Sequence, residues 1–215
     1  MAYCEQTDLV NRVGSTELAR LTNDTAGSSS IDSTVVNSLI QRADATINAK
    51  CKQVYNTPLE KVLTGTIVSS TTTLTGTSTL FTTELEIGDP LKNRATGEIR
   101  LVASLTSATS ATTSVAFTTL SGATLYRIPQ IIFTVSVDLA CFFAMQRRFS
   151  SMEMPADWVR VYDRIMGTPQ KKGILDQIAD MELDLGLTVA SKEATITAPD
   201  ATVAFTDSDS VWSEF

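Results

Sequence analysis

Two acidic clusters come nearest to a chemical site in this chain. In the first, Glu84, Glu86 and Asp89 lie close together, and paired carboxylates of this kind act as general acid and base in glycoside hydrolysis. These acids alternate with Leu85 and Ile87, which is typical of a β-strand with one solvated face. We therefore expect a half-exposed strand here and no catalytic residue.

The second cluster, Asp180, Glu182 and Asp184, has the oxygen ligands that calcium prefers. The acids alternate with apolar residues and lack the spacing of an EF-hand loop, so we interpret them as a solvated face. The glycine patterns of nucleotide-binding loops do not occur in the sequence. We expect no metal and no cofactor.

The chain contains no histidine, which removes the commonest general base and most zinc sites. Its three cysteines, Cys4, Cys51 and Cys141, form no CxxC pair. Cys51 and Cys141 fall in apolar helical patterns, so we interpret them as buried free thiols of a protein made in a reducing cytoplasm. Together these features predict a protein that is not an enzyme.

The net charge of −7 argues against a surface that grips nucleic acid, because such surfaces are usually basic. The only basic doublets, Arg147-Arg148 and Lys171-Lys172, are interpreted as charges at helix ends. An acidic surface does suit a protein beside a DNA path, since like charge keeps the duplex free to slide. The start of the chain lacks a signal peptide, and the apolar stretch 131–145 is too short and too polar to cross a bilayer.

Residues 1–63 are predicted to be helical. Asp32 is expected to cap a long helix that ends at Asn56-Thr57-Pro58. The apolar residues of this helix recur at intervals of three and four, which is the pattern of one buried helical face: Val36, Leu39, Ile40, Ala43, Ile47, Cys51 and Val54.

Residues 64–127 are rich in threonine and serine, which favours strands. Strands are predicted at 66–68, 73–75, 99–103, 114–117 and 125–127, separated by turn signals. The alternative is a low-complexity linker without a core. Against it stand apolar residues sufficient for a small core: Leu80, Phe81, Leu85, Ile87, Leu91, Val102, Phe117 and Tyr126.

Residues 128–187 are predicted to be helical again, with helices that begin near Pro129, Pro155 and Pro169. Residues 188–215 form an acidic, threonine-rich segment that we interpret as an extended arm. Its large apolar residues are candidates for anchoring a neighbouring subunit: Phe205, Val211, Trp212 and Phe215. The alternative is that they pack on the core of their own chain.

The predicted fold is therefore α+β. A helical bundle of about four to five helices (1–63 and 128–187) carries an inserted antiparallel β barrel or sandwich (64–127) and a C-terminal arm (188–215). The insertion lies between two halves of one helical body, as insertions into exposed connections do.

Several motifs occur in order along the chain: the opening Met1-Ala2-Tyr3-Cys4, the pair Pro58-Leu59, the predicted helix of 129–149, the element Arg160-Val161-Tyr162-Asp163 and the Phe205-to-Phe215 tail. Together they resemble the Mu-like phage head-to-tail joining proteins. The resemblance implies a structural virion protein at the head–tail junction. It implies a homo-oligomeric ring, usually dodecameric, that binds the portal and a tail or neck protein while DNA passes without sequence recognition.

Two alternatives stay open at this stage. A β module on a helical stalk would bind a receptor or a glycan, and its cue would be aromatic side chains on exposed strand faces. Another tail-tube or tail-terminator component is close in function to an adaptor, although those proteins tend toward mixed α/β folds.

Overall fold

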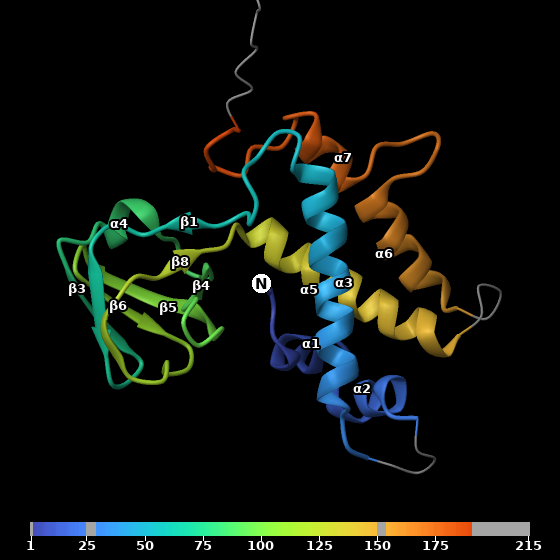
Figure 1. Ribbon diagram of the computed structural model, residues 1–215, viewed down its shortest axis with the longest axis horizontal. Coiled ribbons are helices and arrows are strands. Elements are labelled where there is room, and N and C mark those ends of the chain that lie inside the picture. The colour runs from blue at the N-terminus through green and yellow to red at the C-terminus, as the bar shows by residue number, and fades with distance from the viewer. Residues whose placement is uncertain (1, 25–28, 150–153, 191–215) are drawn as a thin grey trace, which may run out of the picture.

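The computed structural model describes residues 2–24, 29–149 and 154–190. A helical body and a β domain lie side by side along the longest axis of the molecule (Figure 1). The fold is α+β, as predicted. The helical body contains six helices in its described residues, and the β domain contains one further helix of a single turn.

The body begins with two short helices, α1 (Gln6–Val13) and α2 (Ser15–Thr22). Gly14 separates them with a φ of 87°, a conformation that residues with a Cβ rarely adopt. At the N-terminus of α1 the Asp8 side chain accepts the N–H of Glu5, and the Glu5 carbonyl accepts the N–H of Asp8. Both short helices lie against the long helix α5 of the second half.

Two helices of 19 residues form the centre of the body, α3 (Ser33–Cys51) and α5 (Gln130–Arg148). Asp32 caps α3 as predicted, because its side chain accepts the N–H groups of Thr34 and Val35. The helix ends at Cys51, before the predicted stop. α5 begins after Pro129 and is buried along most of its length, which explains the width of its apolar face in the sequence.

Helices α6 (Ala156–Met166) and α7 (Ile174–Ala179) complete the body. The prediction that the last helix begins near Pro169 is wrong, because residues 168–171 form a hydrogen-bonded turn and α7 begins only after Gly173. Gly167 and Gly173 lie backbone to backbone; a Cβ built on Gly173 would come within 2.2 Å of the Gly167 nitrogen. This close approach fixes the angle between α6 and α7.

The β domain is an antiparallel sheet of eight strands: β1 (Lys61–Val62), β2 (Thr66–Ser69), β3 (Thr73–Thr77), β4 (Pro90–Lys92), β5 (Ile99–Ser107), β6 (Ser110–Thr113), β7 (Leu120–Ala123) and β8 (Tyr126–Arg127). The spatial order is β1-β8-β4-β5-β6-β3-β2-β7. The sheet is not closed into a barrel, since β1 and β7 form its two ends. The long strand β5 joins its two halves: residues 99–101 pair with β4, and residues 102–107 pair with β6.

Two strand predictions within this domain are wrong. Residues 114–117 form a loop after β6, because the Thr113 hydroxyl donates to the Val115 carbonyl and closes a turn. Residues 83–89 do not form a half-exposed strand: Glu84 ends the one-turn helix α4 (Phe81–Glu84), and the chain then turns through Gly88.

Two separate apolar cores lie inside the two regions. The core of the β domain consists of eleven buried residues: Leu63, Ile67, Leu74, Phe81, Leu85, Leu91, Val102, Ala111, Phe117, Leu120 and Leu125. The core of the helical body is larger and also takes in Ile99 from β5. A core of this kind is what a low-complexity linker lacks, so the middle of the chain is a folded domain.

Candidate functional site

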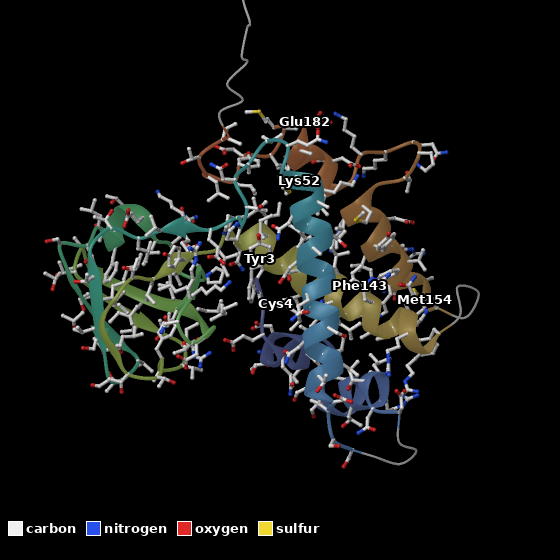
Figure 2. The ribbon with its side chains drawn as sticks, viewed as in Figure 1. Tyr3, Cys4, Lys52, Phe143, Met154 and Glu182 are labelled. Atoms are coloured by element: carbon white, nitrogen blue, oxygen red, sulfur yellow. The ribbon has the colours of Figure 1, made fainter. Side chains whose placement is uncertain are left out.

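A buried polar network lies at the junction of the two regions and is centred on the N-terminal segment. Tyr3 and Cys4 lie between the helical body and the β domain (Figure 2). The Tyr3 hydroxyl donates to Asn48 Oδ1 at 2.5 Å and accepts the N–H of Leu59 at 2.8 Å. Burial raises the pKa of this phenol well above its usual range. Tyr3 therefore joins α3 to the chain segment that enters the β domain.

A buried cation on β4 completes the junction. Lys92 Nζ lies 2.6 Å from a carboxylate oxygen of Glu60, and the two side chains are 3% and 0% exposed. The same ammonium donates to the carbonyl of Ala2 at 2.5 Å, and the second Glu60 oxygen lies 2.8 Å from Arg94 Nε. Because a charge in an apolar interior is costly unless it is paired, the burial of Lys92 depends on β4 lying beside both Glu60 and the carbonyl of Ala2.

A second ionic contact ties β5 to the same segment. Glu5 accepts the backbone N–H of Ile99, and its other oxygen lies 3.2 Å from Arg100 Nη1. Arg100 also binds Glu98 at 3.0 Å. The junction thus fixes both β4 and β5, and it sets the direction in which the β domain projects from the body.

Beneath the junction a carboxyl group is buried between α3 and α5. Asp44 accepts the hydroxyl of Ser136 at 2.7 Å and the N–H of Tyr3 at 3.2 Å. Burial raises the pKa of Asp44 to about 6, against which the hydrogen bonds from Ser136 and Tyr3 and the charge of Lys92 act in the opposite direction. Cys4 Sγ lies 3.3 Å from the Ser136 oxygen and extends this polar cluster.

A further carboxylate connects three helices on the other side of α5. Asp138 binds Arg12 of α1 at 2.7 Å and Arg164 of α6 at 3.2 Å, and its side chain is 5% exposed. The guanidinium of Arg12 also lies 5.5 Å from the ring centroid of Trp158, within the range of a cation–π contact. This group has the geometry of a structural cross-link.

In the structure the acids of the first cluster, Glu84, Glu86 and Asp89, have separate surroundings. Glu84 accepts both the N–H and the hydroxyl of Thr64, whereas Glu86 is exposed. Asp89 is buried and lies 2.9 Å from Arg127 Nε, an ion pair whose angles are not those of a hydrogen bond. Glu84 and Asp89 thus make contacts within the β domain, and the three carboxylates do not converge on one cavity.

The second acidic cluster is paired with a lysine. Lys172 Nζ lies 2.6 Å from both Asp180 and Glu182, while Asp184 accepts the N–H of Gly186. Within residues 2–24, 29–149 and 154–190, no group of three acidic or thiol side chains has the arrangement of a metal site.

The basic doublet Arg147-Arg148 ends α5, as predicted, and has a second contact besides. Arg147 donates to the carbonyls of Leu21 and Thr22, Arg148 donates to that of Leu21, and both guanidiniums pair with Asp24. They therefore cap the C-terminus of a neighbouring helix, where cations are favourable.

Cys51 and Cys141 are buried free thiols, as predicted, and Cys4 is one as well. Burial raises the pKa of Cys51 to about 11 and that of Cys141 to about 12. Among the described residues no helix has the length and hydropathy of a membrane span. The predicted interface arm, Phe205, Val211, Trp212 and Phe215, lies outside the described residues.

Sequence reasoning missed the junction. Lys92 follows Pro90 and Leu91 and precedes Asn93 and Arg94, a pattern that does not mark a buried cation, and its burial is seen only in the structure. Its partner Glu60 is 32 residues away and belongs to no recognisable motif. Local pattern therefore predicts neither the burial of Lys92 nor the carboxylate that neutralises it.

Residues 3–76 match the family model described as Bacteriophage Mu, Gp36. The match covers α1 to α3 and the first three strands, including Tyr3 and the Pro58-Leu59 pair on which the resemblance depends. It supports a Mu-like phage structural protein that is related to the virion. The later motifs, from Pro129 onward, lie beyond the matched residues. Neither a curated protein nor a solved structure matches the chain.

Proposed function

We propose that this chain is a structural, non-enzymatic protein of the phage virion, a head–tail adaptor. Copies form a ring beneath the portal that extends the DNA channel and provides the surface on which the tail docks. The observation that carries the proposal is the match of residues 3–76 to the Mu Gp36 family over the first half of the helical body.

The buried charges at the junction support a mechanical role. Glu60 and Lys92 hold the β domain in one orientation, and a component of a ring must present its surfaces at fixed angles for the ring to close. A net charge of −7 suits a channel through which DNA slides, since the surface repels the phosphates.

The glycan-binding alternative has little support in the β domain. Its cue was aromatic side chains on exposed strand faces, but Phe81 and Phe117 are 0% and 3% exposed. Tyr126 is half-buried, and the guanidinium of Arg94 lies 3.6 Å from its ring centroid. No open aromatic platform for a sugar remains among the strands of the described residues.

Electron microscopy of the purified full chain, alone and mixed with its cognate portal, tests the proposal. We expect rings with a central channel that stack coaxially on the portal. A chain that stays monomeric in both samples at concentrations of tens of micromolar would overturn the adaptor role.

A further inference from the structure

One half of the β domain has a surface without charge. We define the outer sheet as strands β2, β3, β6 and β7 with residues 102–107 of β5. The two stretches of sequence that build it, 62–83 and 101–126, contain no Asp, Glu, Lys or Arg, although the whole chain has 24 acidic and 17 basic residues. In Figure 1, β4 lies on the side of the domain nearest the helical body and β3 on the side farthest from it.

The outward side of this sheet is ordered and rich in hydroxyl groups. Strand register places Thr66 opposite Thr77, and Val68 opposite Thr75. Thr73 lies opposite Thr112, whose hydroxyl is 2.7 Å from that of Ser104. The inward residues between them are buried in the core of the β domain, so the outward side chains are held in a fixed array.

The sheet ends at a short edge strand, β7, that carries no charge and no proline. β7 pairs with β2 on one side only and is the terminal strand in the sheet order. Proteins usually block such edges with lysine, proline or other charges, because free backbone N–H and C=O groups pair readily with another strand. Leu120-Ser121-Gly122-Ala123 contains none of these residues.

A groove runs beside this edge. It has a volume of about 440 Å³ and is lined by residues of β2, β3 and β7, among them Val68, Thr75 and Ser121. Val68 in the groove is 44% exposed. Val115, in the loop that follows β6, is 59% exposed. The centres of protein interfaces are depleted in charge and contain apolar side chains of this kind.

The net charge of the chain and the lack of charge on the outer sheet indicate which partner this surface binds. Two copies of a chain with a net charge of −7 repel each other, and a charge-free face is where they approach with the least electrostatic cost. Nucleic acid would require cations, and none is present on this sheet. A second copy of the same chain therefore fits this face better than a polyanion does.

We propose that the outer sheet is a contact surface between copies of this chain, centred on the β7 edge and the groove beside it. This inference rests on the proposed function and names the face through which neighbouring subunits of the ring meet. The face of one copy contacts a different surface of the next, as a closed ring requires.

The test is a pair of charge substitutions in the full-length protein. The variant Thr73→Glu/Thr75→Glu places two carboxylates on the outward side of β3, where both native side chains are exposed. The control Thr16→Glu/Thr34→Glu makes the same change at exposed positions of α2 and α3 in the helical body, away from the outer sheet. Native mass spectrometry and sedimentation velocity measure assembly over a concentration series.

We expect the outer-sheet variant to need at least about tenfold higher concentration for half-assembly, because buried like charges oppose association, while the control matches the unmodified protein. Equal assembly of all three proteins as rings would overturn the inference and leave the adaptor function standing. Loss of a simple dimer, where the unmodified protein never forms rings, would support the interface and contradict the adaptor. A monomer at every concentration would overturn both.

Thermal unfolding shows whether the outer-sheet variant keeps its fold. If it does not, hydrogen–deuterium exchange of the unmodified protein at low and high concentration decides the question. Slower exchange of the β7 amides on assembly supports the inference, and unchanged exchange there contradicts it.

Discussion

The carboxylate of Asp44 accepts a 2.7 Å hydrogen bond from the hydroxyl of Ser136, and this contact joins the two longest helices inside the core. The two residues come from opposite sides of the inserted β domain, 92 positions apart in sequence. The contact therefore connects the first and second halves of the helical body.

The raised pKa of Asp44 predicts that this site destabilises the fold as pH rises. The pKa is about 6 in the folded protein against 3.8 for an ordinary aspartate, so between pH 4 and 6 the folded state binds more protons than the unfolded state. The site's contribution falls by about 3 kcal/mol in total between about pH 3 and pH 7 and is constant above that range. Urea unfolding of the unmodified protein and of Asp44→Asn at pH 4.5 and 7.5 captures about 2 kcal/mol of this difference. A free-energy gap between the two proteins that does not change with pH would contradict it.

The buried ion pair of the junction predicts a large loss on breaking one side. Lys92→Met leaves Glu60 at 0% exposure with Arg94 as its remaining cation, and we expect a loss of about 3 kcal/mol in unfolding free energy. Arg94→Met removes the more exposed partner of the same carboxylate and should cost about 1 kcal/mol. Denaturant titration of both variants gives the comparison; losses of equal size would show that burial of Lys92 is not what matters.

The ion pairs of Asp138 with Arg12 and Arg164 are expected to stabilise the helical body. Asp138→Asn weakens the contacts with both Arg12 and Arg164 and should lower the unfolding free energy by about 2 kcal/mol, since hydrogen bonds to buried charges are the stronger kind. The control is Asp157→Asn, whose ion pair with Arg160 is almost fully exposed, and we expect no measurable change. A similar melting temperature for all three proteins would refute the cross-linking role of Asp138.

Because the three thiols are buried, we expect them to react slowly with thiol reagents in the folded protein. Cys4, Cys51 and Cys141 are each 0% exposed, and their raised pKa values leave almost no thiolate at neutral pH. A thiol reagent such as DTNB should modify none of the three within minutes in buffer and all three in urea. Rapid stoichiometric modification of the native protein would place a thiol at the surface.

The arm predicted from the sequence can be tested apart from the β domain. Removing residues 191–215 should abolish or weaken assembly at least about tenfold, because buried aromatic anchors dominate the binding energy of interfaces. Replacing Phe205, Val211, Trp212 and Phe215 by serine in the full chain is the matched test, since it keeps the length and charge of the segment. Rings of the truncated chain that form and join tails normally would eliminate the arm as a contact.

The sequence by itself determined the class of the fold and most of its elements. The three- and four-residue spacing of apolar side chains from Val36 to Cys51 predicts α3, and Asp32 marks its start, because helix period and capping are local properties. The same reasoning placed strands in the threonine-rich middle. It failed at Glu84 and at residues 114–117, where alternation is ambiguous and local hydrogen bonds decide the backbone.

Only the tertiary structure decided which charges meet and what the uncharged stretches form. Lys92 finds Glu60, and Asp44 finds Ser136, through the docking of segments that no local pattern relates. The lack of charge in 62–83 and 101–126 is visible in the sequence, but the strand order β6-β3-β2-β7 is what gathers those residues on one sheet with a free edge. Strand pairing and the docking of the two cores are set by long-range packing, and that is why they had to be seen in three dimensions.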